Sequence, residues 1–193
     1  MTIGFDPKLH THKTLKIFFN KTNCKFLPIN QNLIDKLWVK KKTKNPKNKF
    51  YVLPKNAIGK SCSLKIKELV NTLNKKKIDV QFITASENIA WLLNIRGQDS
   101  NFTPLPNSYM TLSSDKKINL FCDLKKVDTS FRKKLKNIKI IDIKNTDLFL
   151  YKIKEKKVMI DSSSCSVYFE NILRANNKIT EFLDPIYFLK SIK

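Results

Sequence analysis

The chain has few of the residues from which enzymes commonly build a catalytic centre. Its 193 residues include only three glycines and two histidines. Three scattered glycines cannot form a phosphate-cradling loop, and no stretch matches a Ser/His/Asp arrangement, HExxH or GxSxG. His10 and His12 form an HxH pair without a third metal ligand nearby, so we interpret them as ordinary side chains near a helix start. The sequence therefore predicts no self-contained active site and no cofactor bound by this chain.

Long apolar runs and close cysteine pairs are missing as well. No window approaches the roughly 18 consecutive apolar residues of a membrane-spanning helix. Residues 1–14 lack the apolar core of a signal peptide. The four cysteines, Cys24, Cys62, Cys122 and Cys165, lie far apart, and we expect reduced thiols. Together these absences predict a cytoplasmic protein with no membrane partner.

Basic charge is what the sequence has in excess, with 38 Lys and Arg against 16 Asp and Glu and a formal net charge of +22. Such a charge is typical of nucleic-acid binding. However, only Arg96, Arg132 and Arg174 are arginine, the residue best suited to phosphates and base edges. The lysines are also scattered over separate turns and helix ends. We therefore expect a solvated basic surface, and we do not expect nucleic acid as a partner.

Hydrophobic periodicity alternates between the two regular types along the chain. Residues 61–74 carry Ile66, Leu69, Val70 and Leu73 at helical spacing behind a candidate Ser61 cap, whereas 79–84 reads as a buried strand. The runs 109–112 and 118–123 flank a turn signal and predict a hairpin. The remaining predicted strands are 25–29, 138–143, 157–161 and 178–182. The remaining helices are 8–20, 31–38, 86–94, 129–137, 146–152 and a face from Cys165 to Leu173. In the helix at 31–38, we expect Leu33, Ile34, Leu37 and Trp38 to point inward. This order predicts an α/β fold with a mixed β-sheet flanked by helices.

One stretch, residues 84–106 (TASENIAWLLNIRGQDSNFTPLP), differs from ordinary core sequence. A short helix is followed by Asn94-Ile95-Arg96-Gly97-Gln98-Asp99 and then by a loop that contains Pro104. An Arg-Gly pair stands out in a chain that uses lysine almost everywhere and glycine almost nowhere. This contrast indicates positions at which the residue type matters.

The stretch resembles the "AWLLNxRGxD…P" signature of the Xaa-Pro aminopeptidase (aminopeptidase P) family, of the creatinase/prolidase superfamily. Matches in the same order extend along the chain. They are Ile3-Gly4-Phe5-Asp6-Pro7 with Leu9-His10-Thr11, Asn32-Leu33-Ile34-Asp35 with Trp38, Gly59-Lys60-Ser61 with Lys65-Ile66, Leu120-Phe121-Cys122-Asp123, and Pro185-Ile186 with Leu189-Lys190 and Ile192-Lys193.

The resemblance implies a creatinase/prolidase N-terminal fold (ribonuclease H-like motif) and a division of the chain. Residues 1–43 resemble the end of the family's first N-terminal-like domain, 44–56 a linker, 57–185 the second such domain, and 186–193 the connection to a catalytic domain. The family's pita-bread catalytic domain carries its two manganese ions and its metal ligands, and no such segment is recognised in this chain. The chain therefore resembles a fragment without metal or catalytic residues of its own.

The implied function is that of the non-catalytic portion of a Xaa-Pro aminopeptidase, which shapes the substrate cleft and helps assembly. Its implied partners are a peptide with proline in second position, its own catalytic domain and a second copy in a homodimer. Arg96 and Asp99 are the candidate cleft-facing residues, with Arg96 expected on a loop where it contacts substrate, pairs with Asp99 or caps helix carbonyls. The alternative is a stand-alone basic module that binds peptide or nucleic acid.

Overall fold

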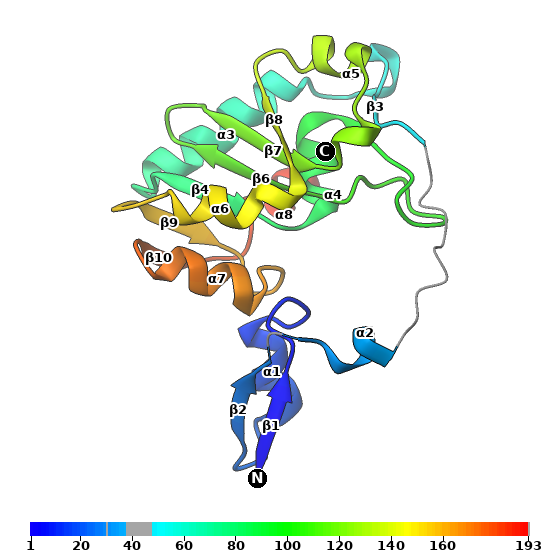
Figure 1. The fold of residues 1–193 in the computed structure, drawn as a ribbon. Coiled ribbons are helices and arrows are strands. Elements are labelled where there is room, and N and C mark those ends of the chain that lie inside the picture. The colour runs from blue at the N-terminus through cyan, green and yellow to red at the C-terminus, as the bar shows by residue number, and fades with distance from the viewer. Residues whose placement is uncertain (30, 38–47, 193) are drawn as a thin grey trace.

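The computed structural model describes residues 1–29, 31–37 and 48–192, and its centre is a six-stranded mixed sheet (Figure 1). The strands follow the order β10-β9-β4-β6-β7-β8. The pairs β10/β9, β9/β4 and β7/β8 are parallel, whereas β4/β6 and β6/β7 are antiparallel. The bounds are β4 (Val80–Ile83), β6 (Ser108–Ser113), β7 (Ile118–Cys122), β8 (Lys139–Asp142), β9 (Lys157–Ile160) and β10 (Lys178–Glu181). The predicted mixed sheet and its internal hairpin are confirmed.

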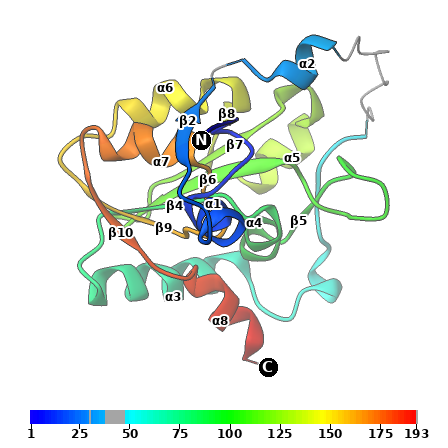
Figure 2. The same ribbon diagram turned by 90° about the horizontal axis from the view of Figure 1, so that it is seen from below.

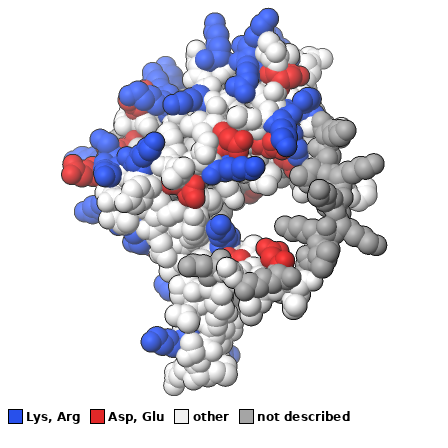
Figure 3. Space-filling model, in the orientation of Figure 1, with Lys and Arg blue, Asp and Glu red and all other residues white. Residues whose placement is uncertain are grey.

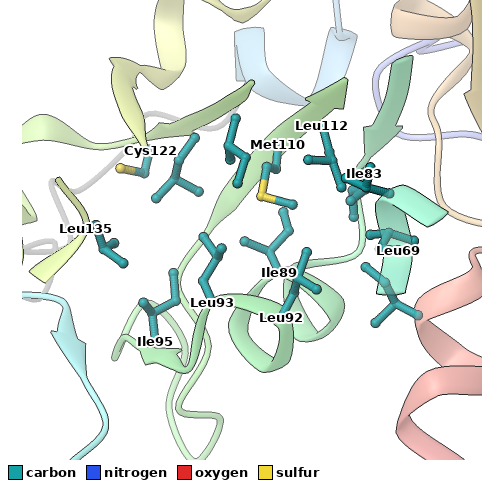
Figure 4. Close-up of a cluster of buried hydrophobic side chains, with 14 of the residues drawn as sticks. Leu69, Ile83, Ile89, Leu92, Leu93, Ile95, Met110, Leu112, Cys122 and Leu135 are labelled. Carbon is teal, nitrogen blue, oxygen red and sulfur yellow. The ribbon is translucent and has the colours of Figure 1, made fainter. Parts of the chain in front are cut away.

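Helices cover both faces of this sheet, as Figure 2 shows from below. One face packs against α3 (Cys62–Lys75), α4 (Ser86–Leu93) and α8 (Pro185–Ser191), and the opposite face packs against α6 (Thr146–Tyr151) and α7 (Val167–Arg174). Figure 4 shows the larger core on the α3/α4 side, with Leu69, Ile83, Ile89, Leu92, Leu93, Met110 and Leu112 buried together. Burial of such side chains contributes about 1.5–3 kcal/mol each, so this layer supplies most of the fold's hydrophobic stabilisation.

Local signals begin the helices where the sequence predicts them. The Ser61 hydroxyl accepts a hydrogen bond from the Leu64 amide at 3.3 Å and caps α3. The Asp128 carboxylate caps α5 (Thr129–Lys134) through the Phe131 amide at 2.7 Å. Each cap satisfies an amide that has no partner within its own helix. The predicted face of α3 is confirmed, since Leu69, Val70 and Leu73 are buried.

A smaller unit at the N-terminus pairs β1 (Thr2–Phe5) in parallel with β2 (Lys25–Pro28) around α1 (His12–Phe19). It lies beside the start of α7 (Figure 1). The Val167 amide donates to the His10 carbonyl and the Tyr168 amide to the Pro7 carbonyl, both at 2.9 Å. The first turn of α7 thus receives acceptors from a segment about 160 residues earlier in the chain.

The prediction for 31–38 is correct in type but wrong in burial. The helix is α2 (Leu33–Leu37), and the side chains expected to point inward are exposed, with Leu37 at 84%. Trp38, the fourth expected inward residue, lies outside the described residues. Among the residues that the structure describes, no layer packs over α2, and its apolar residues therefore face solvent.

The segment predicted as a linker, 44–56, contributes to the folded body at its C-terminal end. Phe50 is only 2% exposed and belongs to the main core, and β3 (Tyr51–Val52) pairs with β5 (Ile95–Arg96). Residues 44–47 lie outside the described residues. At the other end, Ile186 in the first turn of α8 is fully buried, so the expected connection from 186 onward begins as a packed helix. In both places, burial of a large side chain fixes part of the segment within the folded body.

All four cysteines are free thiols, as predicted, and Cys122 and Cys165 are buried. Within the described ranges, no helix is long and apolar enough to cross a membrane.

Candidate functional site

The signature stretch begins with a helix end that only a few residue types tolerate. Asn94 follows α4 with φ 55° and ψ 38°, the left-handed conformation in which asparagine is one of the few acceptable residues besides glycine. Its side-chain amide donates to the Lys60 carbonyl at 3.1 Å, and its carbonyl Oδ1 accepts from Lys65 at 2.6 Å. Asn94 therefore joins the end of α4 to the segment that starts α3.

Lys65 is the most unusual side chain near this helix end, because it is only 2% exposed. Its ammonium group donates to the Trp91 carbonyl and to Asn94, and it lies 4.3 Å from the centre of the Trp91 ring. Burial lowers the pKa of Lys65 to about 8, and the nearby positive charges of Arg96 and Lys60 act in the same direction. The amine is thus a buried cap for the carbonyl end of α4.

We expect the wild type to gain stability relative to the Lys65→Met variant as the pH rises from about 8 to about 10.5. In this window the unfolded chain still binds a proton at Lys65 while the folded chain has lost it. Stability therefore rises with pH through this group, and the Met variant lacks that gain. Urea unfolding of both proteins at pH 7.5 and pH 10 measures the effect. A difference that is the same at both pH values would contradict the lowered pKa.

Arg96 lies in β5, where it pairs with Tyr51, so the prediction that it lies on a loop is wrong. Its guanidinium donates to the Ile95 carbonyl at 2.8 Å and to the Ala90 carbonyl at 3.3 Å. This strand has only two residues and forms because β3 pairs with it. Local periodicity in the sequence does not detect such a pairing between distant segments. The side chain is half-buried and caps carbonyls near the end of α4.

Arg96 and Lys65 share a groove of about 820 Å³ between the start of α3, the end of α4 and the last turn of α8. Lys60 and Lys190 add two further positive groups, and Glu68, which is paired with Lys60, is the acidic residue of the lining. The remaining lining residues are Leu53, Ala57, Ile58, Gly59, Trp91, Asn94, Leu189 and Ile192. The groove therefore offers cations and an aromatic ring to an anionic or carbonyl-bearing group.

Asp99 is held away from Arg96 by partners of its own. Its carboxylate forms an ion pair with Lys126, and the two side chains are 12% and 11% exposed. The same carboxylate accepts from the Asn107 amide at 2.5 Å. Lys126 lies at the end of the 3₁₀ turn η2 (Leu124–Lys126) that follows β7. Asp99 therefore fastens the loop of residues 97–107 to the body, and the predicted pairing with Arg96 is not formed.

Gly97 is required by a close approach of two backbone segments. A Cβ atom at this position would lie 2.8 Å from Cα of Pro106 and 2.9 Å from the Phe50 ring. The Gly97 amide donates to the Pro104 carbonyl at 3.3 Å, which closes the base of the loop. The Arg-Gly pair that stands out in the sequence thus has a packing reason for its glycine.

In the described part of the chain, no group of three His, Cys, Asp or Glu side chains is arranged to hold a metal ion. The two neighbouring histidines have separate contacts. His10 packs edge-on against Phe5, and His12 lies 3.8 Å from the Glu170 carboxylate. The described residues therefore do not fit a resident metal, and we assign no chemical step to one here.

A buried polar cluster around Asp184 has no counterpart in the sequence prediction. Its carboxylate accepts from Gln81 at 2.9 Å, from Asn88 at 2.6 Å and from the Ile186 amide at 3.0 Å. Burial raises the pKa of this carboxyl group, and the three hydrogen bonds oppose the rise. The only hint in the sequence is a glutamine inside the apolar run of β4. The cluster joins β4, α4 and α8 across the edge of the core.

Comparison with known proteins gives one family match. The family model described as "Creatinase/Prolidase N-terminal domain" matches residues 41–193. Among curated proteins, the chain is 29% identical over 201 residues to Xaa-Pro aminopeptidase ApepP of Drosophila melanogaster. It is 30% identical over 204 residues to Xaa-Pro aminopeptidase 1 of Dictyostelium discoideum. Each alignment covers 99% of this chain and 32% of the relative, so the chain spans about a third of the length of these proteins.

A solved structure agrees with the whole described fold. The X-prolyl aminopeptidase of Caenorhabditis elegans, described as a cytosolic enzyme with a di-nuclear active site, superposes with a TM-score of 0.82 at 25% identity. The match covers 100% of this chain and 33% of that protein. The similarity therefore includes the N-terminal unit as well as the six-stranded sheet.

Proposed function

Because the chain belongs to the creatinase/prolidase N-terminal domain family, we propose that it is the non-catalytic portion of a Xaa-Pro aminopeptidase. Such an enzyme is a metallopeptidase that releases the first residue of a peptide ahead of proline. The observation that carries the proposal is the superposition of the entire chain, both units included, on the Caenorhabditis elegans enzyme. A shared sheet alone would support only a shared fold, whereas a shared arrangement of two units supports a shared place in the enzyme.

In this proposal the chain and the catalytic domain have separate roles. The described part of the chain offers no cluster of metal ligands, whereas the matched enzyme is described as having a di-nuclear centre. We therefore place hydrolysis in a separate catalytic domain, with two divalent ions, manganese by family resemblance, supplying the metal-bound water. The localisation proposed for this chain is the cytosol, as for that relative. We propose that residues 57–185 form the second N-terminal-like domain of such an enzyme.

For this chain's own residues, we propose that the groove around Arg96 forms one wall of the substrate cleft. The guanidinium uses Nη1 for the two carbonyls and is half-buried, which leaves part of its donor fork toward the groove. Trp91 and Lys65 line the same groove. Asp99 is not among the lining residues of this groove, and it instead fixes the loop of residues 97–107 that follows β5. It is therefore a positioning residue in this proposal.

We expect Arg96→Lys to lower kcat/KM for an Xaa–Pro peptide by about tenfold, while Arg132→Lys leaves it unchanged. Lysine keeps the positive charge but lacks the planar guanidinium, which in this proposal donates both to the two carbonyls and into the groove. The measurement uses a hybrid in which this chain replaces the region it matches in the Caenorhabditis elegans enzyme. Arg132 is exposed on α5 and provides the matched control. A lower melting temperature with unchanged kcat/KM would show that Arg96 is structural only.

The proposed role in assembly rests on the exposed apolar surface of the N-terminal unit. The large exposed hydrophobic side chains of this unit and of α2, which follows it in the chain, are Met1, Leu9, Ile17, Phe18, Leu27, Leu33, Ile34 and Leu37. A two-stranded sheet is only marginally stable by itself, and apolar patches of this kind are typical of contact surfaces. In this proposal the surface packs against other parts of the assembled enzyme, including a second copy in a homodimer.

A further inference from the structure

The fold gathers lysines that are distant in the sequence around one open groove of about 610 Å³. Lys117 comes from the β6–β7 turn, Lys139 from β8, and Lys152, Lys154 and Lys156 from the segment between α6 and β9. In Figure 3, which shows one face, blue side chains are frequent over the sheet unit, and the N-terminal unit is mostly white. The scattered lysines of the sequence are thus not evenly spread in space.

Among the residues that the structure describes, four of these lysines have no acidic partner. Lys117 is paired with Asp115 at 2.8 Å, and both are exposed. Lys139, Lys152, Lys154 and Lys156 form no ion pair with any residue that the structure describes. Glu155 lies in the same turn but does not line the groove, and no acidic side chain does. Uncompensated positive charges around one concave surface raise the local concentration of anions.

Polar side chains lie in the floor of the groove beside the apolar residues Val80, Ile118, Phe149 and Ile153. Thr111 and Ser113 of β6 and Asn119 of β7 point to the same side as Phe149 of α6. The Asn119 amide donates to the Thr111 hydroxyl at 3.0 Å. The lining therefore combines hydroxyl, amide and apolar side chains below a rim of ammonium groups, and its polar groups and ammonium rim suit phosphate oxygens.

The lining also disfavours a nucleic acid. Among the described residues that line it, none is arginine, tryptophan or tyrosine. Phe149, the aromatic residue of this described lining, packs edge-on against Phe121 with ring centres 5.1 Å apart. Single-stranded nucleic acids are bound through aromatic side chains on which bases stack. The lysine ammonium group is a point charge, so it binds a phosphate without fixing the orientation of the groups attached to that phosphate.

We propose that this groove binds a linear inorganic polyphosphate chain through Lys139, Lys152, Lys154 and Lys156. The binding is electrostatic, needs no base, and is independent of the aminopeptidase role proposed above. The groove is built from strands β6–β8 and α6, on the sheet face opposite to the Arg96 groove, so occupation of one leaves the other open.

The test is a titration of the full chain with short-chain inorganic polyphosphate at several salt concentrations. Replacing the four lysines together by glutamine should weaken binding at low salt by roughly 100-fold and reduce the salt slope by about 3, since each phosphate contact contributes about 0.7. The matched control replaces Lys16, Lys21, Lys25 and Lys67, which are exposed and lie outside the groove, so its net charge is the same. The control should retain the affinity within about threefold, because screening limits distant charges.

Three results would overturn the proposal. Equal losses in both variants would show that only the net charge matters. Tighter binding of single-stranded RNA of the same charge than of polyphosphate would show that bases are recognised. Equal binding of a polyglutamate peptide of the same charge would show that phosphate is not distinguished from carboxylate. Urea unfolding of both variants checks the fold, and a single Lys154→Gln substitution, with an expected loss of about threefold, replaces the quadruple variant if that one unfolds.

Discussion

Replacing Asp99 by alanine is expected to destabilise the isolated chain by about 3 kcal/mol. The carboxylate is the counter-charge of Lys126, and both side chains are nearly buried. Removing it leaves an ammonium group without a partner next to the Phe50 ring, and it leaves the Asn107 amide without an acceptor. Breaking a buried ion pair from one side costs about 3–5 kcal/mol in other proteins, and the residual exposure here favours the lower end.

Two further variants separate the ion pair from a general effect of the substitution. Asp115→Ala removes the acidic partner of Lys117 in an exposed pair and should change stability by less than about 0.5 kcal/mol. The double variant Asp99→Leu with Lys126→Met should recover most of the loss, because no buried charge is left unpaired. Urea unfolding measures all four proteins. An Asp99→Ala variant as stable as the wild type would mean that the carboxylate does not fasten the loop.

The local pattern of the sequence is sufficient for most elements of the sheet unit. Residues 61–74 carry a complete helical face and a serine cap, and α3 follows this pattern closely. The alternation in 109–112 and 118–123 with a turn between them predicts β6 and β7, because a hairpin is formed by neighbouring segments. These elements depend on residues within one or two turns of each other, which is what periodicity measures.

The features that the sequence does not predict depend on contacts between distant segments. The strand β5 exists because residues 51–52 return beside Arg96. The partner of Asp99 is 27 residues away, and the buried Lys65 is surrounded by groups from α4 that come 26 and 29 residues later. Three of the four groove lysines lie close together within residues 152–156, whereas Lys139 comes from β8 and joins them only through the fold. Charge counting along the chain can detect the three but does not place Lys139 beside them.

The candidate site shows the same division. The residues 94–99 are prominent in the sequence, and the structure explains Asn94 by its left-handed conformation and Gly97 by a close approach. The roles expected for Arg96 and Asp99 are separated in space, with one residue facing a groove and the other fastening a loop. A motif thus indicates where structure is constrained, while the fold determines which constraint applies to each residue.

We expect the isolated chain to show no hydrolysis of Xaa–Pro peptides at any manganese concentration. Peptide-bond hydrolysis by this class of enzyme requires a metal-bound water, and the water becomes a nucleophile at neutral pH only on a correctly coordinated ion. The described residues provide no three ligands that converge on one point. The expected difference from the hybrid with a catalytic domain is therefore the full activity of the enzyme.

The most direct measurement compares release of the first residue from an Xaa–Pro–Xaa peptide by the chain alone and by the hybrid with the Caenorhabditis elegans catalytic region, each with manganese and with a chelator. We predict chelator-sensitive release by the hybrid and none by the chain alone. Chelator-sensitive release by the chain alone would contradict this prediction. So would a folded, metal-loaded hybrid that fails to cleave the peptide while the unmodified relative cleaves it under the same conditions.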